Sequence, residues 1–521
     1  RFPTPDEINP DEVVISIQNQ YRVLEEPDYQ VVRTFLDSFD WRLYTGKVSL
    51  WTERGDEDIT ICQNGIPKAP RRIIISGLGL APEYPADLPP GRIQESVARS
   101  LGARAMLPQV EVKSRVRCLR LLDTAEKTVL RVVIEKNASR APGKMGYLSC
   151  GSCIRLIPVR GYPQPFAAVS NLLTERLGVT ATKRGLIDEA LHAIGKSAGN
   201  YSTKLSFEFD PAMRSDQAAK QIHLFLLGII EANVPGVKSN LDSEFLHDLR
   251  VAVRRTRSAL TQFKGVFNEA ESDKYRKRMA WIGEITGPTR DMDVFLLGFA
   301  KYLECIPERF HQDLVPLHLF LENHQRMEHR AMVNKINSPH FRRSLKEWRT
   351  FLQMPAEEMT QGPKAALPVL QLANRRIYKM FQHVVKQGMA ISDESPAEDL
   401  HRLRKSCKTL RYLMEFFQSL YPNKKISYLI KSLKKLLDNL GDFQDFEVQA
   451  EKIRENARQM VGEGEVPHAT LMSMGMLIDG LLRRQQQVRV EFADCFADFS
   501  QADNQRMYKS LFSGKNRKGK A

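Results

Sequence analysis

The fold of this chain is decided by one stretch, His247-Asp248-Leu249-Arg250-Val251-Ala252-Val253-Arg254-Arg255-Thr256-Arg257. Successive residues of a helix turn by about 100°, so one side of this stretch carries four polar side chains: His247, Arg250, Arg254 and Arg257. The reverse side is apolar and can bury Leu249, Val253, Leu260 and Phe263. Like charges one turn apart repel by about 0.2–0.5 kcal/mol per pair. The stretch therefore predicts a helix whose basic side is neutralised by an anion.

The same pattern returns 154 positions later in the chain, with the same spacing, as His401, Arg404, Lys408 and Arg411. Its reverse side is again apolar, with Leu403, Cys407, Leu410 and Phe417. The register also holds further on, because Gly287, Asp291, Asp293 and Val294 correspond to Gly441, Asp445, Glu447 and Val448. A repeat with its charges in phase predicts two similar helical units related by a pseudo-twofold axis.

Composition narrows the class of partner. The chain has 521 residues, enough for two or three domains, and carries a formal charge of +15 with a pI near 9.4. Such an excess favours a polyanionic partner: nucleic acid, an anionic membrane or a phosphate polymer. Seven cysteines, an odd number, indicate a reducing compartment, and we expect a cytoplasmic protein. No apolar run approaches the roughly 20 residues of a spanning helix, and no signal peptide is visible, although the start at Arg1 leaves a removed leader open.

The first 205 residues differ from the rest. Short runs rich in β-formers, separated by Gly and Pro, predict strands at 71–75, 111–121, 129–136 and 147–159. On the second run, Lys113, Arg115 and Arg117 share one face. This alternation suits either a sheet curved around an anion or an exposed sheet with a charged outer face.

One segment of this region, Arg33-Thr34-Phe35-Leu36-Asp37-Ser38-Phe39-Asp40-Trp41-Arg42-Leu43-Tyr44, resembles the start of CYTH domains, the triphosphate tunnel fold. The resemblance implies an eight-stranded antiparallel tunnel lined by Arg, Lys and Glu. Active members carry Glu-x-Glu-x-Lys on their first strand, where the carboxylates hold a divalent metal. The corresponding stretch here, residues 12–22, lacks that motif. We therefore predict no catalytic residue and no cofactor, and keep hydrolysis of triphosphate or short polyphosphate with Mg²⁺ or Mn²⁺ as the alternative.

A second resemblance covers about 300 residues. Residues 244–255, the run Arg290-Asp291-Met292-Asp293, and His401-Arg402-Leu403-Arg404-Lys405 with Lys408, Leu410, Arg411 and Tyr412 resemble a CHAD domain, a family named for histidines in an α-helical fold. The resemblance implies two four-helix bundles around a basic cavity that binds inorganic polyphosphate. CYTH-like and CHAD domains also occur fused in this order.

The predicted fold is multi-domain α+β. Residues 1–205 form a degenerate CYTH-like β tunnel, and residues 206–512 form an all-α CHAD domain with halves at about 206–350 and 360–512. Residues 513–521 form a basic, disordered tail. Gly and Pro breakers in the second domain indicate about eight to ten helices.

The predicted polyphosphate site draws on both repeats. It consists mainly of arginines and lysines, because planar guanidinium groups donate two hydrogen bonds to phosphate and lysines add mobile charge. The first repeat supplies His247, Arg250, Arg254, Arg255 and Arg257, and the second supplies His401, Arg404, Lys405, Lys408 and Arg411. The following helices extend the surface with Lys274, Lys277 and Arg278, and more loosely with Lys431, Lys434 and Lys435. Four carboxylates are expected to orient the arginines rather than hold metal: Asp291, Asp293, Asp445 and Glu447.

Several alternatives stay open. Either histidine can be a satisfied bundle residue. Binding of RNA or DNA is less favoured than polyphosphate, since few stacking aromatics, chiefly Tyr275 and Tyr412, lie near the basic positions. We expect no membrane partner, and association with polyphosphate granules is a further expectation. The fragments Cys150-Gly-Ser-Cys153 and Gly77-Leu-Gly79 lack the context of a metal or dinucleotide site.

Overall fold

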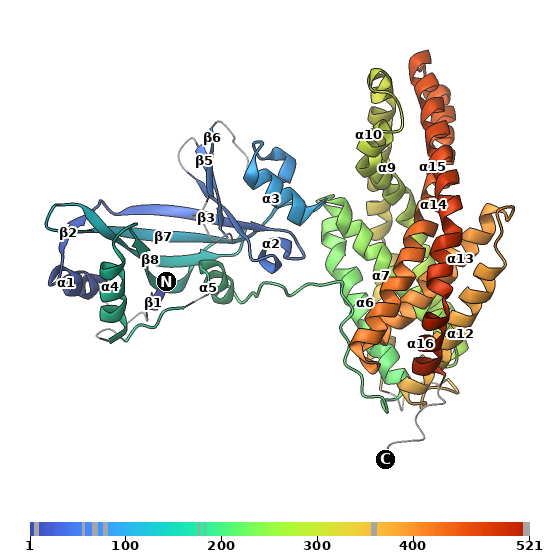
Figure 1. The fold of residues 1–521 in the computed structure, drawn as a ribbon, viewed down its shortest axis with the longest axis horizontal. Coiled ribbons are helices and arrows are strands. Elements are labelled where there is room, and N and C mark those ends of the chain that lie inside the picture. Colours follow the sequence, from blue (N-terminus) through green and yellow to red (C-terminus); the bar gives the residue numbers. More distant parts are fainter. Residues whose placement is uncertain are drawn as a thin grey trace. The chain divides into compact units, whose positions relative to one another are not determined.

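The computed structural model describes residues 1–4, 10–54, 58–64, 71–76, 82–175, 178–182, 184–355 and 362–513. The chain divides into two compact units, Arg1–Ser202 and Thr203–Ala521, here termed the β unit and the helical unit (Figure 1). The Gly77-Leu-Gly79 fragment and residues 514–521 of the basic tail lie outside the described residues.

An antiparallel sheet forms the β unit, as the sequence predicted. Its hydrogen-bonded path runs β1-β9-β8-β7-β3-β4-β5-β6, with β2 also paired to β7. Within the described residues no ladder joins the two end strands, β1 and β6. The strands are β1 (Phe2–Thr4), β2 (Arg22–Glu25), β3 (Tyr29–Asp37), β4 (Ser49–Arg54), β5 (Asp58–Asn64), β6 (Arg71–Ser76), β7 (Leu107–Leu122), β8 (Thr128–Arg140) and β9 (Leu148–Pro158).

Helices cover parts of this sheet. They are α1 (Pro10–Gln18), α2 (Arg42–Thr45), α3 (Arg92–Leu101), α4 (Pro163–Glu175) and α5 (Leu186–Ala193). The resemblance to CYTH domains placed residues 12–22 on a first strand, but most of this stretch belongs to the helix α1. Val13, Val14 and Ile17 recur at helical spacing and are buried, so one helical face packs on the sheet while the acidic first turn stays outside.

Alternation along β7 follows the pleat of a half-exposed sheet. Val112 and Val116 are buried, whereas Lys113 and Arg115 are exposed. Arg117, on the same side, forms ion pairs with Glu25 and Asp11. The outer face of the sheet is therefore the charged one, and the basic residues of β7 do not enclose an anion.

At the end of β3 the chain doubles back, as the CYTH-like segment suggested. The carboxylate of Asp37 accepts hydrogen bonds from the backbone nitrogens of Ser38, Leu43 and Tyr44 at 2.7, 2.9 and 2.8 Å. Burial raises the pKa of Asp37 to about 6. These bonds fasten α2 against β3, so that β4 returns antiparallel to it.

The described part of the helical unit contains eleven α-helices, one more than the upper end of the prediction. They are α6 (Ser215–Lys238), α7 (Ser243–Gln262), α8 (Glu269–Ile285), α9 (Gly287–Leu303), α10 (Val315–Ile336), α11 (Pro339–Gln353), α12 (Val369–Met389), α13 (Ala397–Phe416), α14 (Asn423–Glu463), α15 (His468–Ser500) and α16 (Ala502–Phe512). The break between α15 and α16 falls at Gln501, which is extended, and no Gly or Pro marks it. None of the helices within the described residues combines the length and apolarity that a membrane crossing requires.

The duplication is visible in the helix boundaries. α7 and α13 begin and end 154 positions apart, and α6 and α12, like α8 and α14, begin at the same offset. The copies differ at Pro288, whose missing N–H ends one helix and suits the first turn of the next. The first copy is therefore split into α8 and α9, whereas α14 runs through as a single helix of 41 residues.

Two reciprocal hydrogen bonds mark the pseudo-twofold axis. The backbone nitrogen of Ser215 donates to the carbonyl of Leu367, and that of Val369 donates to the carbonyl of Met213, both at 2.8 Å. Each donor and each acceptor has its counterpart 154 positions away. Such mutual contacts are what a twofold relation between two similar units produces.

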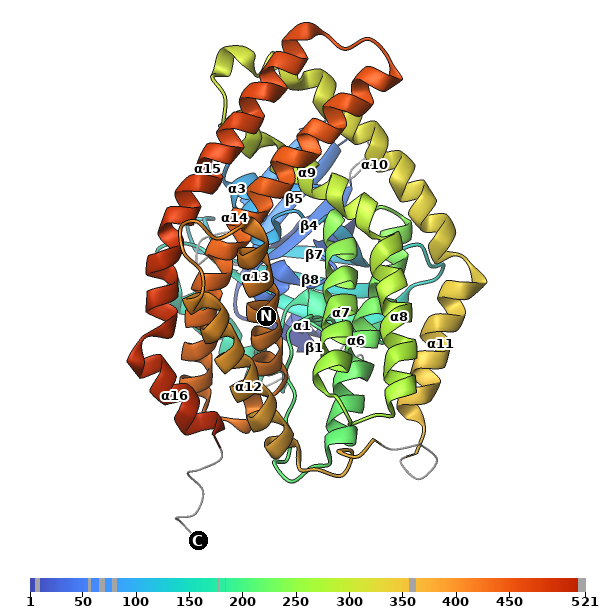
Figure 2. The same cartoon turned by 90° about the vertical axis from the view of Figure 1, so that its right-hand side faces the viewer.

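Packing around this axis brings the two basic helices together. α7 contacts α6 and α8 in one copy, and α13 contacts α12 and α14 in the other, while α7 and α13 lie side by side (Figure 2). Beyond them, α9, α10, α14 and α15 share a hydrophobic core that includes Phe295, Phe299, Leu317, Ile453 and Leu477. The basic helices are thus held between well-packed layers.

Candidate anion-binding site

The apolar side of each basic helix fixes where its charges point. On α7, Leu249 and Val253 are buried, and on α13 Leu403, Cys407 and Leu410 are buried. α7 also has a firm start, because Asp242 accepts hydrogen bonds from the first-turn nitrogens of Glu244 and Phe245. The opposite, basic sides are therefore left for other contacts.

Arg254 and Lys408, equivalent residues of the two repeats, lie near each other at the centre of the candidate site. Arg254 is exposed and Lys408 is half-buried, and neither forms an ion pair with a carboxylate in the described parts of the chain. Burial, together with the nearby charges of Arg404 and Arg254, lowers the pKa of Lys408 to about 8. Arg254 Nε donates to the hydroxyl of Tyr412 at 3.1 Å. Neither of these like charges is therefore in an ion pair within the described residues, and Asp445 is the opposing charge that acts on Lys408.

Further cations of α13 surround this pair. Arg404 Nη2 lies 3.0 Å from Asp445 Oδ1, and Arg411 Nε lies 3.3 Å from Glu415. Arg404 Nε is buried and has no hydrogen-bond acceptor among the residues described. Lys405, like Arg257 on α7, is exposed and forms no ion pair within those residues.

Arg250 fastens α7 to the junction between α8 and α9. Its Nη1 donates to the carbonyl of Gly283 at 2.7 Å and to Thr286 Oγ1 at 2.9 Å. Burial and the charges of Arg254 and Arg290 lower the pKa of Arg250. Its charge is therefore fixed in place beside the other cations, and Asp291 is the carboxylate whose charge acts on it.

Arg255 points elsewhere. Its Nη2 pairs with Glu415 at 2.9 Å and its Nη1 donates to the carbonyl of Thr203 at 3.2 Å, with only 13% of the side chain exposed. This arginine is already neutralised and anchors the start of the helical unit to α7.

The two histidines make corresponding contacts with different partners. His247 Nδ1 accepts a hydrogen bond from Arg290 at 3.0 Å, since a guanidinium can only donate. His401 Nδ1 instead contacts the amide oxygen of Gln444, the equivalent of Arg290. Nδ1 of His247 is therefore engaged by Arg290.

Arg290 is a member of the site that sequence reasoning missed. Besides binding His247, it donates to the carbonyl of Ser243 at 3.2 Å. Burial lowers the pKa of Arg290, and Arg254 is among the charges that act on it. Its place directly before Asp291, in a run singled out as a motif, was the available signal. We refer below to the basic cluster, which comprises Arg250, Arg254, Arg257, Arg290, Arg404, Lys405, Lys408 and Arg411.

Two of the four carboxylates lie at the basic cluster. Asp445 pairs with Arg404, although 57% of its side chain is exposed. Burial raises the pKa of Asp291, against the opposing charges of Arg250 and Lys452. Among the residues described, Asp445 is thus the one of the four that forms an ion pair with a predicted arginine.

The other two carboxylates form no ion pair with the predicted arginines within the described residues, although the charge of Asp293 acts on Arg290. Asp293 is buried and accepts a hydrogen bond from Gln325 of α10 at 3.0 Å. Burial, with the neighbouring charge of Glu398, raises the pKa of Glu447. Cations therefore outnumber carboxylates around Arg254 and Lys408.

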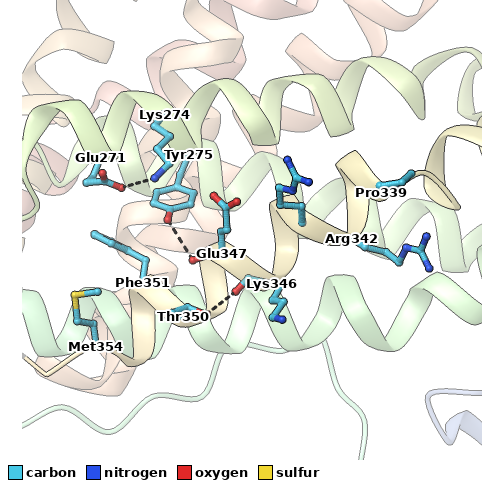
Figure 3. Close-up of a pocket in the computed structure, with 11 residues that line it drawn as sticks. Glu271, Lys274, Tyr275, Pro339, Arg342, Lys346, Glu347, Thr350, Phe351 and Met354 are labelled. Atoms are coloured by element: carbon cyan, nitrogen blue, oxygen red, sulfur yellow. Dashed lines mark hydrogen bonds and ion pairs between the residues drawn. The ribbon is translucent and has the colours of Figure 1, made fainter.

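The predicted extension on α8 lies elsewhere on the helix. Lys274 pairs with Glu271 at 3.2 Å (Figure 3). Arg278 pairs with Glu347 of α11 at 2.6 Å. At about 100° per residue, Lys274 is on the opposite side of α8 from Gly283, which Arg250 contacts. Lys277 is exposed. Charge had selected these residues without regard to which side of α8 faces α7.

The extension on α14 is divided. Lys431, Lys434 and Lys435 are all exposed. Lys435 lies toward Cys495 of α15. Lys434 precedes Gly441 by seven residues, or about two turns, so it shares the side of α14 that faces Arg404. Of these three lysines, Lys434 is placed to add to the cluster.

A family model described as the CHAD domain matches residues 223–454. The chain contains a CHAD domain. The match begins within α6 and ends within α14, and it includes the whole basic cluster. No curated protein matches the chain.

Two solved structures are similar to the region that holds the CHAD domain. The CHAD domain from the plant Ricinus communis has a TM-score of 0.48 and 23% identity, and the match covers 57% of this chain and 97% of that one. PptA from Streptomyces chartreusis has a TM-score of 0.42 and 16% identity, with 54% and 99% covered.

Outside the CHAD domain, the antiparallel sheet of the β unit is consistent with a CYTH-like tunnel. No group of three or more His, Cys, Asp or Glu is placed to hold a metal ion in the part of the chain that the structure describes. Cys150 and Cys153 both lie on β9 as free thiols, and burial raises the pKa of Cys150 to about 11.

Proposed function

We propose that the CHAD domain binds inorganic polyphosphate at the basic cluster. The observation that carries this proposal is the closeness of Arg254 and Lys408, neither of which forms an ion pair with a carboxylate in the described residues. Crowded like charges raise the free energy of the unliganded protein, and a polyanion that approaches both relieves that cost. Arg404 adds a buried Nε with no acceptor in the described residues.

The composition of the cluster suits a phosphate polymer. Besides Arg254, the basic cluster contains five arginines whose planar guanidinium groups can donate two hydrogen bonds to phosphate oxygens, while Lys405 and Lys408 act as point charges. The five are Arg250, Arg257, Arg290, Arg404 and Arg411. The cations come from both repeats, so a chain with many phosphates satisfies more of them than a single phosphate does. The CHAD match and the polyphosphate binding that the sequence resemblance implies support the same ligand.

The aromatic neighbours favour polyphosphate over nucleic acid. Tyr412 is 2% exposed, its hydroxyl binds Arg254, and the guanidinium carbons of Arg255 and Arg411 lie 5.7 and 5.5 Å from its ring centre. Tyr275 is equally buried. Recognition of single strands relies on bases stacked on accessible rings, and neither tyrosine offers one.

Binding of a long polyphosphate to the full chain tests the proposal. The variant Arg254→Ala/Arg404→Ala/Lys408→Ala should lose most of its affinity for polyphosphate. The plot of log affinity against log salt should become less steep by about 2–3, because with three phosphate contacts removed fewer counterions are released on binding. A matched variant that removes three exposed lysines elsewhere, Lys424→Ala/Lys425→Ala/Lys509→Ala, should keep both. Unchanged affinity in the first variant contradicts the proposal, and so does single-stranded RNA that competes as strongly as polyphosphate.

The proposal extends to the cell. A protein that captures polyphosphate in the cytoplasm would gather on phosphate-rich granules through the bound polymer. A fluorescent fusion should therefore co-localise with such granules, whereas the triple variant Arg254→Ala/Arg404→Ala/Lys408→Ala should spread evenly.

A further inference from the structure

The helical unit has a recess away from the basic cluster. It lies between α8 and α11 and has a cavity volume of about 800 Å³. Its lining mixes apolar, aromatic and basic side chains, chiefly Tyr275, Pro339, Arg342, Lys346, Phe351 and Met354. We refer to it as the α8–α11 groove.

The two ends of the α8–α11 groove differ in chemistry. Phe351 and Met354 lie at one end, and Pro339 and Arg342 lie at the other (Figure 3). Phe351 packs against Tyr275 with ring centres 5.1 Å apart, and Met354 is half-buried. One end therefore offers an apolar floor, and the other offers charge.

The charge of the groove is unevenly neutralised. Its two carboxylates are already engaged, Glu271 with Lys274 and Glu347 with Arg278. Three exposed cations of α11 form no ion pair among the described residues: Arg342, Arg343 and Lys346. They lie in the first half of α11, whose N-terminus adds partial positive charge. An anionic partner is therefore favoured at this end.

We propose that the α8–α11 groove docks an acidic peptide segment that carries an apolar side chain. The apolar side chain occupies the end formed by Phe351 and Met354, and the carboxylates of the segment pair with the cations of α11. A phosphate chain is a poorer fit, since it has no apolar group to cover Met354. The groove also lies on the side of α8 opposite to Gly283, so its occupant is separate from the ligand of the basic cluster.

Fluorescence anisotropy with two labelled twelve-residue peptides tests this docking on the full chain. One peptide contains glutamate, leucine and a single phenylalanine, and the other replaces the apolar residues by serine. The apolar peptide should bind about tenfold more tightly, since burial of one or two apolar side chains is worth that much. Arg342→Glu/Arg343→Glu should weaken it by about tenfold or more, and Met354→Asp should weaken it by about fivefold.

A matched charge reversal serves as the control. Lys424→Glu/Lys425→Glu changes two adjacent exposed lysines at the start of α14 and should leave peptide affinity within about twofold. The proposal is overturned if this control loses as much affinity as the groove variant, or if the serine peptide binds as well as the apolar one. It is also overturned if Arg342→Glu/Arg343→Glu weakens polyphosphate binding and polyphosphate displaces the peptide, because the groove then belongs to the phosphate surface. If variants of the basic cluster show that it does not bind polyphosphate, the peptide measurements on the α8–α11 groove still stand.

Discussion

Arg33 in the β unit and Lys408 in the helical unit are both cations withdrawn from water, but their surroundings are opposite. Arg33 is surrounded by acceptors, with Glu53 at 3.2 Å, Ser114 at 3.1 Å and Glu135 at 3.0 Å. Lys408 has three arginines around it and no ion pair in the described residues. Burial alone would lower the pKa of Arg33, yet its carboxylates raise it, whereas the pKa of Lys408 is lowered to about 8.

This difference separates two uses of buried charge. A cation matched by carboxylates, like Arg33, is complete without a ligand and holds strands together. A cation surrounded mainly by other cations, like Lys408, is what the proposed function assigns to binding an anion from outside. Substitutions in the first group should therefore change stability, and substitutions in the second should change binding.

The largest effect is expected from Glu135→Gln. Glu135 is 2% exposed and binds both Arg33 and Arg155 at 3.0 Å, so the amide leaves two cations poorly matched in the sheet. Loss of one partner from a buried pair costs about 3–5 kcal/mol of unfolding free energy. Chemical denaturation should show this loss in the transition of the β unit, with polyphosphate affinity unchanged. A variant as stable as the wild type would contradict the claim that matched buried charges stabilise the β unit.

Arg255→Ala should act on stability within the helical unit. It removes the pair with Glu415 and the hydrogen bond to the carbonyl of Thr203, and charge-assisted bonds of this kind contribute about 1.5–3 kcal/mol. Thermal denaturation should detect the change, and polyphosphate affinity should stay within about twofold. If affinity falls as far as in Arg254→Ala, Arg255 belongs to the ligand site.

Polyphosphate affinity should fall as pH rises from 7 to 9. Under the proposed function Lys408 pairs with phosphate in its protonated form. Its pKa near 8 in the free protein must then rise on binding, so affinity is full below pH 8 and declines above it. If binding raises the pKa of Lys408 by one unit, polyphosphate affinity should decline by about tenfold in total. Calorimetry from pH 7 to 9 measures this decline. Lys408→Arg should flatten the profile, because a guanidinium stays charged among Arg254, Arg404, Arg411 and Asp445. A wild-type profile as flat as that of the arginine variant would show that Lys408 does not meet the ligand.

The smallest effect is expected from Arg117→Ala on the outer face of the sheet. Its partners Asp11 and Glu25 have exposed side chains, and exposed ion pairs contribute about 0–1 kcal/mol. Denaturation curves of the variant and the wild type should nearly coincide. A loss of unfolding free energy as large as that of Glu135→Gln would show that exposed and buried ion pairs contribute equally to the stability of the sheet.

Periodicity predicted much of this structure. The repeat of 154 positions located α7 and α13, and the alternation on β7 located a strand. In both cases the spacing of side chains along one element carries the information. The resemblance to CYTH domains alone placed residues 12–22 on a first strand. A short apolar run with Val13, Val14 and Ile17 suits a strand or a helix equally well until its partner surface is known.

The centre of the site could be predicted, but its edges could not. Arg254 and Lys408 were found because they recur in phase within two helices. Lys274 and Arg278 were included for their charge, yet the side of α8 that faces α7 depends on packing that no local pattern shows. Arg290 was overlooked for the same reason, since its contact with His247 joins two helices.

The most direct test compares stability and affinity in one variant, Arg254→Ala/Lys408→Ala. Removal of two crowded cations should leave the melting temperature of the helical unit unchanged or higher, while polyphosphate affinity falls by about a hundredfold, as expected for two lost charge contacts. Unchanged affinity, or a melting temperature that falls along with it, would mean that these residues hold the bundles together and do not await a polyanion.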